Sequence, residues 1–238
     1  MSEPQNPYEA PESVLADPED VVGGSIESAL AGEYTFGIGD LLNEAWLLIS
    51  GFKASFWGAV IGIMFIQLAI NGIAAATISD MVILVIVQYV VVFATLPLNA
   101  GIFMLAIRRS AGLDVKAVEV TGYYAYIGRL VLLYVLSMVL IMLGYLLFVL
   151  PGIYLTVGYI FAIPLLLDKN LSPWRALETS RKAVQHCWFK IAGLLLVIGL
   201  ILMLSTLALL IGLIWAAPLC TVVLGLLYVN MFGYGREQ

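Results

Sequence analysis

Five carboxamide side chains lie within the long apolar stretches of this chain, where polar groups are scarce. Gln67 and Asn71 are four residues apart, so they share one face of a helix. An amide without a partner is costly in hydrocarbon, so we expect these groups to face each other or a wet cavity. The two alternatives are hydrogen bonding between helices and a polar pocket for a small molecule or a lipid headgroup. The five residues are Gln67, Asn71, Gln88, Asn99 and Asn230.

Catalytic chemistry finds little support in the residue types. The only histidine is His186, beside Trp188, and no second histidine or cysteine pair lies at a spacing suited to a metal. Cys187 and Cys220 are expected to be unpaired thiols. No nucleophile-elbow or metalloprotease motif occurs. We therefore expect no enzymatic activity, no cofactor and no metal site.

A group of four bases follows the fourth apolar stretch. Ordinary anchoring on the cytoplasmic side of a membrane and specific binding of an anionic lipid are the two explanations for it. The bases of the whole chain are spread along the sequence and form no patch, so a nucleic acid is not an expected partner. The four residues are Arg175, Arg181, Lys182 and Lys190.

The elements that must position these groups are helices in a membrane. The chain has 238 residues, of which 62% are hydrophobic and 11% charged, and its mean hydropathy is +1.03. Several apolar runs reach the ~20 residues that a membrane-spanning helix needs. The sequence predicts an all-α protein with six transmembrane helices, at about 56–78, 82–107, 130–150, 152–168, 189–211 and 214–232.

The fourth of these segments is short. At ~1.5 Å per residue it gives about 26 Å of helix, so we expect local thinning of the bilayer, snorkelling of Lys169, or a turn buried within the protein. Prolines and a glycine mark candidate interruptions in this and other segments. These candidate helix breaks are Pro97, Pro151, Gly152, Pro164 and Pro218.

The eleven lysines and arginines predict the orientation. Alternating the six segments places all of them on one face, whereas the connections near Ser79–Asp80, Pro151–Gly152 and Gly212–Leu213 contain none. Such a bias predicts that the basic face is cytoplasmic. We therefore expect a multi-pass protein of the bacterial inner membrane with both termini in the cytoplasm.

Residues 1–35 differ in composition from the rest. Residues 1–40 carry nine acids and no base, whereas the remainder has seven acids and eleven bases, giving 11 − 7 = +4. We expect an acidic, largely irregular cytoplasmic tail over 1–35 and a membrane domain over 36–238. The tail could hold a protein partner or support a homo-oligomer, while the membrane domain contacts the lipid bilayer and an anionic lipid.

Two amphipathic helices are expected at the membrane interface. Asp40 resembles an N-cap for the first, whose apolar residues follow at helical spacing, and Ser172–Pro173 opens the second. An interfacial segment before each pair of spans indicates a weak threefold repeat of helix hairpins. Gly58 and Gly62 form a small-residue step that favours close packing within the chain over dimerisation.

Three stretches resemble a known family. They are Leu150-Pro151-Gly152-Ile153-Tyr154-Leu155, Phe161-Ala162-Ile163-Pro164-Leu165 and the segment from Leu171 to Arg181, together with Asn6-Pro7-Tyr8-Glu9-Ala10-Pro11 near the start. The chain resembles small six-span inner-membrane proteins of Gram-negative bacteria, which are distantly similar to the membrane domain of bacterial glycerophosphodiester phosphodiesterases. This resemblance implies a fold and a location, and no catalytic residue.

The sequence leads to two hypotheses about function. The first is a non-catalytic inner-membrane protein that organises lipid or protein partners in envelope maintenance. The second is a permease or lipid-handling transporter with a polar pocket between the first, second and sixth spans, which would then have to be neighbours.

Overall fold

The computed structural model describes residues 23–207 and 210–235, and this part of the chain is built from helices. Six helical segments are long and apolar enough to cross a membrane, which confirms the expected all-α membrane fold. In chain order the elements are α1 (Ile26–Ala31), α2 (Ile38–Thr77), α3 (Met81–Ser110), the 3-10 helix η1 (Ala117–Tyr126), α4 (Ile127–Leu147), α5 (Val149–Gly158), α6 (Ala162–Asp168), α7 (Pro173–Gln185), α8 (Trp188–Leu207) and α9 (Leu213–Phe232).

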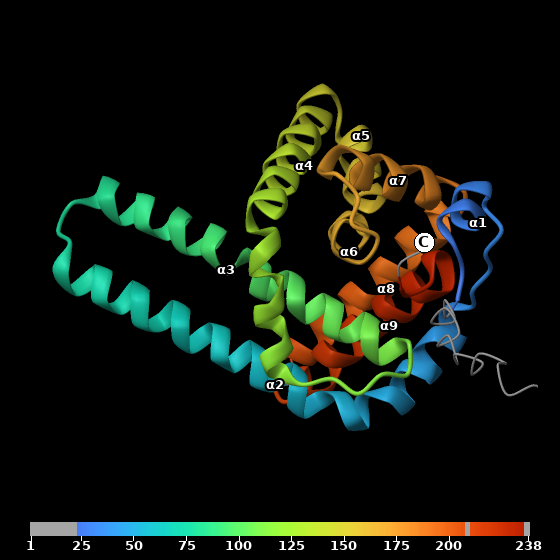
Figure 1. Cartoon of the computed structure of the whole chain (residues 1–238), viewed down its shortest axis with the longest axis horizontal. Helices are drawn as coiled ribbons and strands as arrows, with labels where there is room; N and C mark the ends of the chain where they lie inside the picture. Colours follow the sequence, from blue (N-terminus) through green and yellow to red (C-terminus); the bar gives the residue numbers. More distant parts are fainter. Residues whose placement is uncertain (1–22, 208–209, 236–238) are drawn as a thin grey trace, which may run out of the picture.

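Three helix hairpins share one packed base. The hairpin of α2 and α3 and the hairpin of α4 and α5 extend from this base in different directions (Figure 1). The third hairpin joins α8 to α9, and α9 packs against both α2 and α3. Spans one, two and six are therefore neighbours, as the sequence predicted.

Helix α2 differs from its predicted form. We expected a separate interfacial helix before the first span, but the structure has one helix of 40 residues that bends along its length (Figure 1). Its N-cap is Gly37, and Asp40 lies in its first turn instead of capping it. The expected apolar spacing continues without interruption: Ala45, Ile49 and Phe52 are buried in the base, so packing holds this half of the helix.

The α4–α5 hairpin turns at Phe148, not at Pro151–Gly152 as predicted. Phe148 has an extended backbone (φ −162°, ψ 153°), and Pro151 and Gly152 lie inside the first turn of α5. Proline is tolerated in a first helical turn because the amide it lacks would have no partner there. Gly152 approaches Gly144 and the Tyr145 ring so closely that an added Cβ would collide with the ring.

Of the three remaining prolines predicted to break helices, two lie inside continuous helices and one follows an interruption. Pro97 lies inside α3 and Pro218 inside α9, and neither helix is interrupted at its proline. Each proline removes one backbone hydrogen bond, but the long apolar helices around them continue. Pro164 is in the first turn of α6, after an interruption that begins at Tyr159. This interruption divides the short fourth span.

The end of the expected acidic tail is part of the folded base. Ser25 and Ser28 form a reciprocal capping box for α1. Ala29 is fully buried, and α1 packs on α7 and α9. Packed structure therefore begins with α1, before the boundary predicted at residue 35. The remainder of the predicted tail, residues 1–22, lies outside the described residues.

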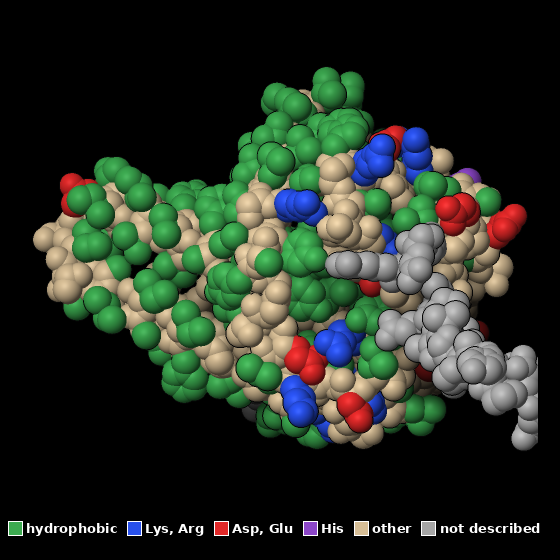
Figure 2. Space-filling model, viewed as in Figure 1, with side chains coloured by type: hydrophobic (Ala, Val, Ile, Leu, Met, Phe, Trp, Pro, Cys, Tyr) green, Lys and Arg blue, Asp and Glu red, His purple; other side chains and the backbone are tan. Residues whose placement is uncertain are grey.

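Basic side chains gather on the base, whereas the acidic Asp80 lies in the outer connection of the first hairpin. On the face seen in Figure 2, Lys and Arg side chains lie over the base, and the hairpins that leave it are covered by apolar side chains. Arg108 pairs with Glu119 of η1 at 2.8 Å, and Arg109 donates to the Leu48 carbonyl of α2 at 3.4 Å. These contacts fasten the inner ends of α2 and α3 to each other and to η1.

Candidate functional site

The predicted amide cluster is present only in part. The amide nitrogen of Gln67 donates to the hydroxyl of Thr95 at 3.1 Å, which joins α2 to α3. Thr95 itself donates to the Val91 carbonyl at 2.9 Å, and the Asn99 amide donates to the Thr95 carbonyl at 3.0 Å. Thr95 is 3% exposed. It is the centre of this network, and a search restricted to carboxamides missed it. Its spacing of four residues from Asn99 was the available signal.

The other amides do not converge on a shared pocket. Asn71 is half-buried, whereas Gln88, Asn99 and Asn230 are exposed. Asn230 is distant from the others because α9 meets α2 near Trp57, whose indole donates to the Ile214 carbonyl at 3.0 Å. The opposite end of α9, which carries Asn230, packs beside the start of the described chain, where the Gly24 amide donates to Val229. In the described part of the chain, the amides of spans two and six therefore lie apart from the hollow that Gln67 and Asn71 line on α2.

The interrupted fourth span is closed by a serine from another helix. Ser180 of α7 is fully buried. Its hydroxyl donates to the Gly158 carbonyl at 2.6 Å and accepts from the Phe161 amide at 3.2 Å. Irregular backbone at membrane depth is tolerated only where protein or water satisfies it. Of the three explanations for the short span, the one that agrees with the structure is a turn that is buried within the protein.

A buried charge pair ends this span. The side chain of Lys169 is 2% exposed and that of Asp168 is 5% exposed, so Lys169 does not snorkel. Tyr228 donates to Asp168 at 2.9 Å, and Lys169 donates to the Gly235 carbonyl at 2.7 Å. Buried ions persist where hydrogen bonds satisfy them. The pair connects the segment after α9 to the end of α6. In the sequence, this contact was indicated only by an acid and a base at adjacent positions.

The four predicted anionic-lipid contacts have different local partners. Arg181 donates two hydrogen bonds to the Glu178 carboxylate, at 3.1 and 2.8 Å, and the Lys182 ammonium lies 3.4 Å from the same carboxylate. These neighbours, the Arg181 hydrogen bond foremost, lower the pKa of Glu178. Lys190 lies over the Phe36 ring at 4.6 Å. Arg175 is exposed and has no ion-pair partner among the described residues. Glu178 therefore neutralises part of the charge of Arg181 and Lys182, whereas Arg175 keeps its charge unpaired among the described residues.

His186 and the predicted second interfacial helix make packing and hydrogen-bond contacts within the base. The Nε2 atom of His186 lies 2.9 Å from the Leu30 carbonyl, and the Tyr34 hydroxyl donates to Ala183 at 2.8 Å. Burial raises the pKa of Tyr34. Helix α7 starts with Pro173 at its first turn, as predicted, and its apolar face packs on α4, α5 and α6. Within the described residues no group of three His, Cys, Asp or Glu side chains is arranged for a metal.

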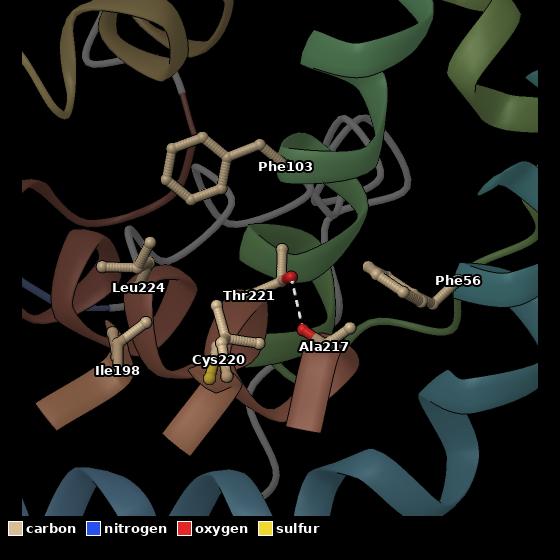
Figure 3. A pocket seen from close by; sticks show the side chains of 8 residues that line it. Phe56, Phe103, Ile198, Ala217, Cys220, Thr221 and Leu224 are labelled. Carbon is tan, nitrogen blue, oxygen red and sulfur yellow. Dashed lines mark hydrogen bonds between the residues drawn. The ribbon is translucent and has the colours of Figure 1, made fainter. Parts of the chain in front are cut away.

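An apolar cavity of about 300 Å³ lies between α2, α3, α8 and α9. Figure 3 shows its side chains facing one another from these helices, and the Thr221 hydroxyl is turned away to the Ala217 carbonyl, 2.8 Å distant. Cys220 is a free thiol in its wall, as predicted. The cavity is lined by Phe56, Phe103, Ile198, Leu202, Ala217, Cys220, Thr221 and Leu224.

A base and two indoles lie next to this cavity. Lys53 is one turn before the lining residue Phe56, and its ammonium lies 5.6 Å from the centre of the Trp215 ring, two residues before Ala217. Lys53 has no ion-pair partner among the residues that the structure describes. Trp57 completes this group. An apolar cavity with a cation and indoles beside it has the chemical character of a membrane interface.

This arrangement corrects one predicted placement. The sequence put Lys53 and the connection at Gly212 on opposite faces of the membrane, but Lys53 lies beside Trp215, three residues after Gly212. The reason is that α9 meets α2 near Trp57. The 20 residues of α2 beyond that contact add about 30 Å to the first hairpin. The third hairpin therefore reaches less far than the first.

Comparisons with protein-family models, with curated proteins and with solved structures found no match to this chain.

Proposed function

We propose that this chain is a multi-pass protein of the bacterial inner membrane that organises lipid or protein partners in envelope maintenance without catalysing a reaction, and that its direct ligand is lipid. One observation carries the proposal: the apolar cavity between α2, α3, α8 and α9, with Lys53 beside it. The resemblance to six-span inner-membrane proteins supports the same location.

The ligand that fits this site is a phospholipid with an anionic headgroup. An acyl chain matches the aliphatic and aromatic lining, which offers it no polar group in need of a partner, since Thr221 is bonded to its own helix. A phosphate fits beside Lys53, whose ammonium is not neutralised by a described carboxylate. Trp57 and Trp215 are suited to the level of the ester groups.

Lipid retention tests this function. We expect native mass spectrometry of the protein, released from gentle detergent, to show a bound anionic phospholipid. Ala217→Phe fills the cavity and should remove most of this mass shift. Ala76→Phe, at an exposed position outside the cavity, is the matched control and should retain the lipid. Equal retention by the two variants would refute the cavity as the lipid site.

Lys53 should decide the headgroup preference. Lys53→Gln removes the charge beside the cavity and leaves its lining unchanged. We expect the preference for phosphatidylglycerol over phosphatidylethanolamine to fall while the total number of bound lipids stays constant. A preference that does not change would show that Lys53 takes no part in headgroup binding.

We also propose that the described ends of the chain face the cytoplasm. The Gly24 amide bonds to Val229, so both ends belong to the base, where the basic side chains also lie. Cysteine introduced at Asp80 in a Cys-free chain should react with an impermeant thiol reagent in spheroplasts, and cysteine at Ser110 should react only after permeabilisation. The reverse pattern would invert the orientation.

A lipid-handling transporter is the second candidate, favoured by the interruption at residues 159–161. Broken helices form the substrate sites of many transporters. Here Ser180 satisfies two buried backbone groups at the interruption. Transporter function predicts that purified protein accelerates the movement of fluorescent phospholipid between the leaflets of a proteoliposome. An organising protein should leave that rate at the level of protein-free vesicles.

A further inference from the structure

The outer part of the first hairpin, residues 61–92, stands apart from the rest of the molecule. We call it the first arm. Its buried residues are Ile63, Ala74 and Val91, and of these only Ile63 belongs to the buried core of the base. The nearest ring contact to another element joins Phe93 to Tyr134 of α4, at the inner end of the arm. Figure 1 shows the arm extending beyond that point without another helix beside it.

Polar side chains follow one side of the first hairpin, within the arm and at its inner end. With 3.6 residues per turn, Gln88 and Asn99 lie within about 40° of Thr95 on α3, whereas Phe93 lies nearly opposite. On α2, Asn71 lies about 40° from Gln67 in the same rotational sense. Because the two helices are antiparallel, equal rotational offsets place these side chains on the same side of the hairpin. We call this set of five residues the polar seam.

The inner and outer members of the polar seam differ in one respect. Gln67, Thr95 and Asn99 are hydrogen-bonded within the hairpin. The side-chain amides of Asn71 and Gln88 have no hydrogen-bond partner among the described residues, and Gln88 is exposed. They lie seven residues before Ile78 and eight after Asp80, or about 10–12 Å below the outer connection. At that depth the surroundings are hydrocarbon, where an unpaired amide is costly.

The polar seam borders a hollow of about 400 Å³ on α2. Gln67 and Asn71 form its polar edge, and its other lining residues are Ile61, Met64, Phe65 and Leu68. Leu68 is 69% exposed, so this hollow is a groove on the surface of the arm. A groove with an apolar floor and an amide edge is shaped for another helix with a matching edge.

We propose that the polar seam is the interface through which two copies of this chain associate. An acyl chain offers no donor or acceptor to Asn71 or Gln88. A second copy related by a two-fold axis presents the same amides, so each Asn71 and Gln88 gains a partner in one self-complementary contact. Amides of this kind associate transmembrane helices, for which lipid supplies no hydrophobic driving force. This inference goes beyond lipid binding and does not depend on the cavity.

Disulfide formation in membranes tests the interface. Cys187 and Cys220 are replaced by serine, and one cysteine is introduced at Leu68 in the groove or at Ile66 on the other side of α2. Both positions are exposed, at 69% and 47%, and they lie two residues apart, so their depth in the membrane is nearly equal. We expect L68C to form a covalent dimer under mild oxidation and I66C to remain monomeric.

The amides are then removed in the L68C background. Asn71→Leu with Gln88→Leu should weaken dimerisation about tenfold, measured as the lipid-to-protein ratio at which the dimer is half dissociated. Thr77→Val, which removes a hydroxyl bonded to Ile73 of its own helix and lies outside the polar seam and the groove, is the matched control and should change this ratio little. The unfolding midpoint of each variant verifies that the hairpin is intact.

Three results would overturn the proposal. They are equal crosslinking of L68C and I66C, crosslinking of L68C that is insensitive to loss of Asn71 and Gln88, and crosslinking to a different protein in place of a second copy.

Discussion

Replacing Ser180 with alanine removes the one described side chain that bonds the backbone on both sides of the interruption in span four, at Gly158 and Phe161. Its hydroxyl donates to Gly158 at 2.6 Å and accepts from Phe161 at 3.2 Å. Each buried backbone group left without a partner costs about 1–3 kcal/mol. Two such groups, partly relieved by local relaxation, give an expected loss of about 2–4 kcal/mol in the free energy of unfolding.

The matched control is Ser137→Ala, because the Ser137 hydroxyl donates only to Tyr134 of its own helix, at an exposed position. We expect that variant to change stability by no more than about 0.5 kcal/mol. Titration with SDS in mixed micelles, followed by tryptophan fluorescence, measures both. Hydrogen exchange at the Phe161 amide should also accelerate in Ser180→Ala. If Ser180→Ala costs no more than Ser137→Ala, the account of the interruption is wrong.

Three further predictions concern the stability of the fold. A double-mutant cycle of Gln67→Leu and Thr95→Val should give a coupling of about 0.6–1.7 kcal/mol, as for other hydrogen bonds between membrane helices, and a coupling near zero would show that the 3.1 Å contact does not bind α2 to α3. Gly152→Ala should destabilise the α4–α5 hairpin by about 1–3 kcal/mol, because the added methyl group meets an aromatic ring, and an unchanged midpoint would contradict the close approach. Because Arg181 lowers the pKa of Glu178, this pair should stabilise the fold above the ordinary carboxyl pKa and lose its effect as the pH falls through the lowered value, so the melting temperature of Glu178→Gln should depend less on pH in the acid range.

The sequence predicted the elements better than their contacts. The length of the apolar runs correctly predicted six spans, and the serine and proline at 172–173 correctly predicted the start of α7. These features are local, so length and composition determine them. The bend of α2 and its continuous course were not predictable, because they depend on packing of Ala45, Ile49 and Phe52 in a base formed by distant segments.

For the site, the sequence predicted the types of polar residue inside the spans but not the contacts that they make. The amides were correctly identified as polar groups inside spans, but Thr95 was overlooked, and it accepts the one interhelical amide bond of the described part. Ser180 could not be assigned from the sequence, because its partners at Gly158 and Phe161 are more than 18 residues away. The interruption itself lies among apolar residues, and Pro164 marked it only approximately.

The central claim is that an anionic phospholipid places an acyl chain between α8 and the first hairpin. The most direct measurement is photocrosslinking in nanodiscs with phosphatidylglycerol that carries a diazirine in its acyl chain, followed by peptide mapping. The account predicts that labelling concentrates on the cavity lining, including Phe103 and Cys220, and that Ala217→Phe reduces it severalfold at those residues alone. Equal labelling along all lipid-facing helices, unchanged by Ala217→Phe, would contradict it.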